Sequence, residues 1–233
     1  MKKIGFIGAY DKTDFIIYIA RALVELGKRV LVVDSTVNQK AKYIVPTISP
    51  SISYITEYEG IDVAVGLYSF EAIANYLGSP VFDQNEYEYI LIDIDDPEML
   101  ERFNMYDAYK NYFVTSFDLF SLKRGIEILS GIREPMELTK ILFSKYMSEE
   151  EDDYLNFLSL GKKMKWNEER IYFPFDNGDQ SIIIENQRIE KIKIKGLSSE
   201  YKETLMYLTE QILENENKGN IKRAFRQLEK GGE

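Results

Sequence analysis

The residues that could do chemistry lie first of all in the turn that follows the opening apolar run. Phe6–Asp14 reads Phe-Ile-Gly-Ala-Tyr-Asp-Lys-Thr-Asp. A phosphate-binding loop reads Gly-x-x-x-x-Gly-Lys-Ser/Thr, in which the lysine reaches the phosphates and the hydroxyl binds magnesium. Lys12 and Thr13 stand at those last two positions, whereas Phe6 and Asp11 replace the glycines. Taken alone, the turn is more typical of an ordinary helix cap than of a phosphate site.

Two further candidate groups are aspartates that end apolar runs. Arg29–Asp34 reads Arg-Val-Leu-Val-Val-Asp, and Tyr89–Asp93 reads Tyr-Ile-Leu-Ile-Asp. Such runs favour strands that are buried on both faces of a parallel sheet. Ligands of open α/β sheets bind at the carboxyl ends of the strands. We therefore expect Asp34 and Asp93 at the same edge of the sheet as the turn.

The composition limits which kinds of site the chain can hold. It has 233 residues, no cysteine and no histidine, and a formal net charge of −10. Disulfides, thiolate zinc sites, cysteine nucleophiles and histidine bases are therefore excluded. The acidic balance argues against a main role in gripping nucleic acid. Neither a signal peptide nor an apolar run of membrane-spanning length is present, so we expect a cytoplasmic protein.

The elements that must position these residues alternate between strands and helices. The predicted strands are Lys3–Gly8, Arg29–Asp34, Ile61–Val65, Tyr87–Ile94, Asn111–Thr115, Leu138–Phe143, Arg170–Phe173 and Ser181–Glu185. The predicted helices are Lys12–Leu26, Ser69–Leu77, a short one from Pro97, Asp118–Leu129, Ser148–Leu160 and Ser198–Leu213. This alternation predicts an α/β fold, a mostly parallel twisted sheet with helices on both faces. Residues 1–213 would form one domain.

The end of the chain has a different composition. Residues 214–220 read as a linker, and residues 221–233 contain an apolar stripe formed by Ile221, Phe225 and Leu228. Basic residues surround this stripe: Lys222, Arg223, Arg226 and Lys230. Basic amphipathic helices bind anionic membrane surfaces. Two interpretations stay open: a membrane-surface helix, or a helix that docks on its own domain or on a partner protein.

Several blocks of the chain resemble the MinD/ParA family of P-loop ATPases, the SIMIBI-class group with a deviant Walker A loop. The resemblance rests on Lys2–Gly8, on Gly27–Asp34 (Gly-Lys-Arg-Val-Leu-Val-Val-Asp), and on Tyr89–Asp93, which looks like the Walker B strand. Ile171–Asp176 is similar to the family's segment near the nucleotide base. The resemblance implies ATP and magnesium as cofactors. It would place Gly8, Asp11, Lys12, Thr13 and Asp14 around the nucleotide, and Thr13, Asp34 and Asp93 around the metal.

The chain departs from the family pattern where that pattern carries the reaction. The signature lysine falls on Ile7, the glycine before the second lysine on Asp11, and the hydrolytic aspartate on Thr36. Asp14 replaces the second threonine of the loop. A carboxylate ~4 Å from a phosphate oxygen repels it by about 1 kcal/mol in water and about 4 kcal/mol at an effective dielectric of 20. The resemblance thus implies a degenerate member that keeps the fold without hydrolysis, and we assign no catalytic residue.

The resemblance favours a non-hydrolysing protein that localises or scaffolds a bacterial membrane-associated assembly. A pilus or secretion system is the leading choice, because Tad-pilus localisation proteins of the TadZ/CpaE type also have degenerate loops. The alternative is an active ATPase that dimerises with ATP and serves division-site placement or DNA partition. Either would form a homodimer through the loop face, where we expect Ile7 and Tyr10 to contact the second copy. MinD-like proteins end in a short membrane-binding helix, which would place this chain at the inner face of the cell membrane.

Overall fold

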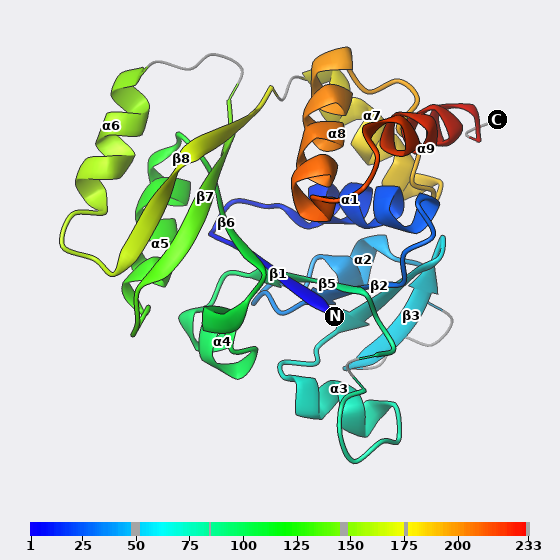
Figure 1. Ribbon diagram of the computed structural model, residues 1–233, viewed down its shortest axis with the longest axis horizontal. Coiled ribbons are helices and arrows are strands. Elements are labelled where there is room, and N and C mark those ends of the chain that lie inside the picture. Colours follow the sequence, from blue (N-terminus) through cyan, green and yellow to red (C-terminus); the bar gives the residue numbers. More distant parts are fainter. Residues whose placement is uncertain (48–51, 84, 145–148, 175–176, 232–233) are drawn as a thin grey trace.

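An eight-stranded sheet runs through the centre of the computed structural model, which describes residues 1–47, 52–83, 85–144, 149–174 and 177–231 (Figure 1). The strand order is β3-β4-β2-β5-β1-β6-β7-β8, and every neighbouring pair is parallel except β3 with β4. The strands are β1 (Lys2–Ile7), β2 (Val30–Asp34), β3 (Tyr54–Tyr58), β4 (Ile61–Val65), β5 (Tyr89–Ile94), β6 (Lys110–Ser116), β7 (Met136–Phe143) and β8 (Met164–Phe173). The predicted α/β class and the mostly parallel sheet are confirmed.

Helices cover both faces of this sheet and enclose two separate apolar cores. The first face carries α1 (Thr13–Glu25), α2 (Ala41–Ile44), α7 (Asn177–Arg188), α8 (Ser199–Leu213) and α9 (Lys218–Lys230). The second carries α3 (Phe70–Tyr76), α4 (Pro97–Arg102), the 3-10 helix Met105–Asp107, α5 (Leu119–Ser130) and α6 (Glu149–Leu158). Because successive side chains of a strand point to opposite faces, β1 sends Ile4 to the first core and Ile7 to the second.

Three strands with nearly continuous apolar runs, β1, β5 and β2, occupy the middle of the sheet. β5 lies between β1 and β2, and every residue of β2 and β5 is buried. Their register pairs Phe6 with Asp93 and Asp93 with Asp34. Their near-continuous apolar character therefore reflects helices on both sides. The register also places Asp34 and Asp93 beside each other at the carboxyl edge, as expected.

The structure also contains the unpredicted short helix α2, and β8 begins at Met164 rather than at the predicted Arg170; the two largest differences concern α7 and β3. Ser181–Glu185 was expected as a strand but lies inside helix α7. Its run of isoleucines mimics a strand, yet Ile183 is buried in the first core and Asn186 bonds to Tyr18 of α1, so tertiary contacts decide the conformation. Strand β3 was not predicted. It forms a hairpin with β4 through Glu59 and Gly60, which both have positive φ.

Helix α9 packs against its own domain. It begins at Lys218, inside the predicted linker, where the Asn217 side chain accepts a hydrogen bond from the Gly219 amide. Its three stripe residues are buried in the same core cluster as α1 and α8, with exposed fractions of 1% for Ile221, 7% for Phe225 and 7% for Leu228. Of the two interpretations of this stripe, the structure has docking on its own domain, and the stripe does not face a membrane in this conformation because it is already covered.

The charged residues of α9 have a different environment from its apolar stripe. Lys222, Arg223 and Arg226 are exposed on the outer side of the helix. At the end of α8 and the start of α9, Lys218 lies 3.2 Å from a carboxylate oxygen of Glu210.

No helix formed by the described residues is both long and apolar enough to cross a membrane.

Candidate functional site

The candidate site begins where β1 ends and α1 begins. Gly8 has φ +147°, and a Cβ there would lie 2.2 Å from the backbone oxygen of Val114 in β6. The amide of Gly8 also donates to the Ile94 oxygen at 2.9 Å. Glycine at this position is therefore required by the close approach of β6. The loop then runs outward through Ala9 and Tyr10, and α1 starts at Thr13.

The structure brings together three of the candidate site residues, Lys12, Thr13 and Asp93. The Lys12 ammonium is buried, 2.8 Å from the Gly8 oxygen and 2.6 Å from Oδ1 of Asp93. The Thr13 hydroxyl donates to Oδ2 of Asp93 at 3.1 Å. Burial raises the pKa of the Asp93 carboxyl to about 6 against the opposing charge of Lys12. The ammonium of Lys12 therefore contacts the end of β5 and the Gly8 oxygen.

Both carboxylate oxygens of Asp34 accept hydrogen bonds from the segment that follows β2. Its Oδ1 accepts hydrogen bonds from the Thr36 amide at 3.1 Å and the Thr36 hydroxyl at 2.6 Å, and its Oδ2 accepts from the Ala41 amide at 2.8 Å. Thr13 and Asp93 fit a magnesium ion, because this ion is held by one or two protein groups together with substrate phosphates. Among the described residues, no group of three or more carboxylates is placed to hold a metal.

A second cluster closes over the mouth of the loop. The Lys40 ammonium lies 2.6 Å from Oδ2 of Asp11 and also forms an ion pair with Asp14. Gln187 of α7 donates to both oxygens of Asp14 at 2.8 and 3.0 Å. Burial lowers the pKa of Lys40, but the charges of Asp14 and Asp11 raise it by more, so the net shift is upward. We call Asp11, Asp14 and Lys40 the loop lock.

Sequence reasoning found Asp11 and Asp14 but missed Lys40. Lys40 lies in the segment between β2 and β3, and its carboxylate partners are 26 and 29 residues away in the chain. One lysine in a loop carries no signal of such a contact. Only the packing of this segment against the start of α1 brings the three charges together.

The loop and the lock line a hollow of about 490 Å³. Its walls carry three carboxylates, Asp11, Asp93 and Asp95, and two ammonium groups, Lys12 and Lys40. The remaining lining comes from the loop and the segment after β2: Gly8, Ala9, Tyr10, Thr13, Thr36, Asn38 and Tyr43. A polyphosphate would therefore enter a hollow whose own charge is slightly negative, which opposes binding of an anion.

Of the two residues predicted to contact a second copy at this face, Ile7 is not available to it, whereas Tyr10 is partly exposed. Ile7 is fully buried in β1, between β5 and β6. Tyr10 stacks on Phe143, with 4.8 Å between the ring centroids. Other apolar side chains on this edge do reach solvent, with exposed fractions of 80% for Tyr43 and 70% for Phe120 at the start of α5. The segment Ile171–Asp176 was expected near the nucleotide base from the family resemblance. Its residues 175 and 176 lie outside the described part of the chain.

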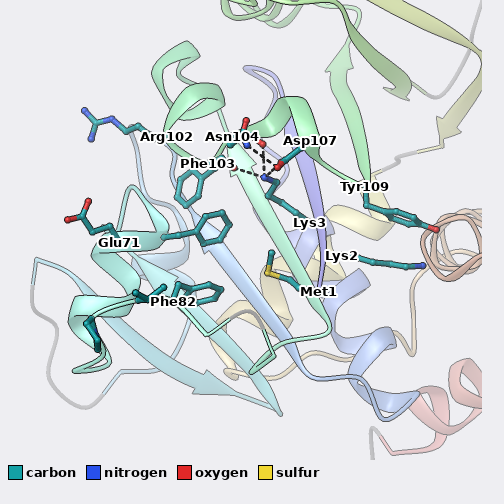
Figure 2. Close-up of a pocket in the computed structure, with 13 residues that line it drawn as sticks. Met1, Lys2, Lys3, Glu71, Phe82, Arg102, Phe103, Asn104, Asp107 and Tyr109 are labelled. Carbon is teal, nitrogen blue, oxygen red and sulfur yellow. Dashed lines mark hydrogen bonds and ion pairs between the residues drawn. The ribbon is translucent and has the colours of Figure 1, made fainter.

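A second hollow, of about 680 Å³, lies around the amino end of β1 (Figure 2). Lys3 points into it, but its ammonium donates to the Phe103 oxygen at 2.8 Å and the Asn104 oxygen at 2.6 Å, and it pairs with Asp107. The ammonium of Lys2 instead lies 4.0 Å from the centre of the Tyr109 ring. Since Lys3 is saturated by these partners, it clamps the α4–β6 connection to the sheet.

Comparisons with solved structures identify the fold. The ParA family ATPase from Chlorobium tepidum TLS matches with a TM-score of 0.57 and 16% identity over 88% of this chain and 96% of that chain. The MinC:MinD cell division protein complex from Aquifex aeolicus matches with a TM-score of 0.58 and 14% identity, over 93% of this chain and 97% of that chain. The ParA of pNOB8, bound to nonspecific DNA, matches with a TM-score of 0.52 and 14% identity, over 93% of this chain and 99% of that chain. No protein-family model and no curated protein matches the sequence.

These matches cover nearly the whole of each chain, so the fold is that of the MinD and ParA P-loop NTPases. At identities of 14–16% they establish the architecture and not the chemistry. In this chain Lys12, Thr13 and Asp93 meet at the carboxyl edge of the sheet, and the loop lock stands beside them.

Proposed function

We propose that this chain is a non-hydrolysing protein of the MinD/ParA fold that localises or scaffolds a membrane-associated assembly. The observation that carries the proposal is the loop lock, because Lys40 bridges Asp11 and Asp14 across the mouth of the loop. In an active loop this space holds phosphate oxygens, which backbone amides and a lysine stabilise. Here the chain supplies its own carboxylates and neutralises them itself.

Nucleotide binding must displace these internal contacts before any new ones form. The Lys12 ammonium has to leave Asp93 and the Gly8 oxygen, which together satisfy a buried charge. The carboxylate of Asp11 would then face the incoming phosphates, a repulsion of about 1 to 4 kcal/mol at ~4 Å depending on solvent screening. Asp11 is more than half exposed, so the lower figure applies. The resting protein therefore favours the nucleotide-free state.

Two other positions at which the chain departs from the family pattern, Thr36 and Ile7, support the same conclusion. Thr36, at the position of the family's hydrolytic aspartate, bonds to Asp34 and holds the segment after β2 in place. Ile7, at the position of the signature lysine, is buried and cannot reach another copy's nucleotide. A pilus or secretion assembly remains the favoured client, on the resemblance to TadZ/CpaE-type proteins. The homodimer and a position at the inner face of the membrane belong to the same proposal, with the membrane contact supplied by the assembly because the α9 stripe is buried.

The alternative is a working ATPase for division-site placement or DNA partition. The contact of Thr13 and Lys12 with Asp93 favours it, because these three groups are those a P-loop uses for magnesium and phosphate. The similar structures include a MinD with MinC and a ParA on nonspecific DNA. DNA binding here would have to overcome the net charge of −10.

The test compares ATP turnover and Mg-ATP binding in the wild type, Lys12→Ala, Asp11→Asn and Asp11→Gly. We expect no phosphate release above that of Lys12→Ala, which serves as the background. We expect Asp11→Asn to tighten Mg-ATP binding by about fivefold through loss of ~1 kcal/mol of repulsion. Asp11→Gly should tighten it further, because it also frees the loop backbone. Turnover by the wild type that Lys12→Ala abolishes would establish the alternative.

A further inference from the structure

Helix α6 has an apolar face that the domain does not cover. Its inner side packs on the sheet through Leu155, which is fully buried, and through the Lys140–Asp152 ion pair at 2.7 Å. On its outer side, the exposed fractions are 38% for Tyr154, 66% for Phe157 and 71% for Leu160 in the turn after the helix. These three residues are spaced i, i+3, i+6 and therefore form one ridge. We call them the α6 ridge.

The position of the α6 ridge separates it from the other surfaces described above. α6 lies at one end of the molecule beside β7 and β8, far from α9 (Figure 1). It is also distinct from the loop face, because Phe157 and Leu160 belong to the end of the helix that leads into β8. The ridge exposes on the order of 300 Å² of apolar surface, about the size of the largest apolar patch on a typical monomer, which is often functional.

The charges on α6 are arranged for pairing with an identical helix. Asp153 is exposed near its start, while Lys162 is exposed just past its end. Two copies related by a two-fold axis place their helices antiparallel, so each acidic start meets the other's basic end. An axis through Phe157 puts Tyr154 of one copy opposite Leu160 of the other. The same register brings Asp153 near Lys162.

We propose that the α6 ridge is a contact with a second copy of this chain, formed by antiparallel pairing of the two α6 helices about Phe157. Each ridge residue then meets an apolar partner, and the charges at both ends attract. The contact is weak by itself, because stable interfaces bury about 800 Å² per partner. It is independent of the proposed function, since no residue of the loop or the loop lock takes part.

Single cysteines test the pairing directly, because the chain contains none. A residue on a two-fold axis meets its own copy, so Phe157→Cys should form a disulfide-linked dimer under mild oxidation. Val81→Cys is the matched control, since Val81 is exposed to 72% on a different surface. We expect Phe157→Cys to cross-link at least about tenfold faster at low micromolar protein, from its higher effective concentration. Equal rates for the two variants would overturn the proposal.

The register has its own test in the same assay. A mixture of Tyr154→Cys and Leu160→Cys should yield the mixed dimer faster than either variant links to itself. In the Phe157→Cys background, Asp153→Lys and Lys162→Glu should each slow cross-linking, and the two together should restore it. A double variant as slow as the single ones would exclude the antiparallel register. ATP turnover and Mg-ATP binding should be unchanged in Phe157→Glu, which keeps this test separate from that of the proposed function.

Discussion

Asp93 illustrates how burial sets the chemistry of single residues in this site. It stands at the end of β5 with Lys12 on one oxygen and the Thr13 hydroxyl on the other. In water such a carboxyl titrates near 3.8, whereas in the folded chain burial raises its pKa to about 6. The charged form is therefore less stable inside the protein than in the unfolded chain, even with a lysine beside it.

This upward shift predicts how stability depends on pH. The folded state holds the Asp93 proton more tightly than the unfolded state, so the free energy of unfolding falls as pH rises from about 4 to about 6. One group with this shift contributes about 2 to 3 kcal/mol to that fall. Asp93→Asn has no proton to lose. Urea unfolding at several pH values should therefore show the wild type losing stability relative to Asp93→Asn across this window, and parallel curves would contradict the raised pKa.

The sequence predicted part of the site at this scale and missed the rest for a physical reason. Lys12, Thr13 and Asp93 could be placed because each stands at a fixed offset from a recognisable strand. Lys40 could not, since its contacts with Asp11 and Asp14 depend on how a loop folds back over α1. Asp34 was predicted beside Asp93, but the sequence could not show that the Thr36 and Ala41 amides take its oxygens.

At the scale of elements, the last helix shows how a surface pattern can mislead. The α9 stripe is what a membrane-surface helix would display, and the sequence left docking on the domain as an equal interpretation. The surface that covers it comes from α8, the helix directly before it, and from α1, which is distant in the chain. Lys202 of α8 also lies 2.7 Å from Glu229 of α9, and Lys28 lies 3.4 Å from Glu216 just before it.

Docking of α9 predicts that its apolar residues stabilise the whole domain. Phe225→Ala should lower the free energy of unfolding by about 2 to 4 kcal/mol, because it removes a buried aromatic ring and leaves a cavity. Arg223→Ala is the control on the same helix, where an exposed side chain should change stability by no more than ~0.5 kcal/mol. Urea denaturation followed by circular dichroism measures both. Equal, small effects would mean that α9 is detached in solution.

Strand β3 and helix α7 mark the limits of pattern reading for elements. The β3–β4 hairpin had a local signal, a two-residue Glu59-Gly60 turn between two short runs. Helix α7 had none, because its β-branched run favours a strand locally. The hydrogen bonds of Asn186 to Tyr18 and to the Lys193 oxygen fix it as a helix only in the folded domain.

The whole molecule offers two distinct surfaces to another copy. The loop face lies at the carboxyl edge, where Tyr43 and Phe120 are exposed, and the α6 ridge lies on the helix beside β7 and β8. A protomer that uses one two-fold contact still has the other free. Unless the two axes close a ring, such a molecule grows into chains, which is a geometry suited to a scaffold.

This arrangement predicts a distinct size distribution for each variant. In sedimentation velocity at rising concentration, the wild type should pass from monomer through dimer to larger species, because each contact is weak but the two act together. Phe157→Glu should stop at a dimer held by the loop face, and Phe120→Glu at a dimer held by α6. The combined variant should stay monomeric, and Val81→Glu should behave as the wild type. If Phe157→Glu reaches the same larger species as the wild type, α6 contributes nothing to assembly. If Phe120→Glu does so, the loop face is not the second contact.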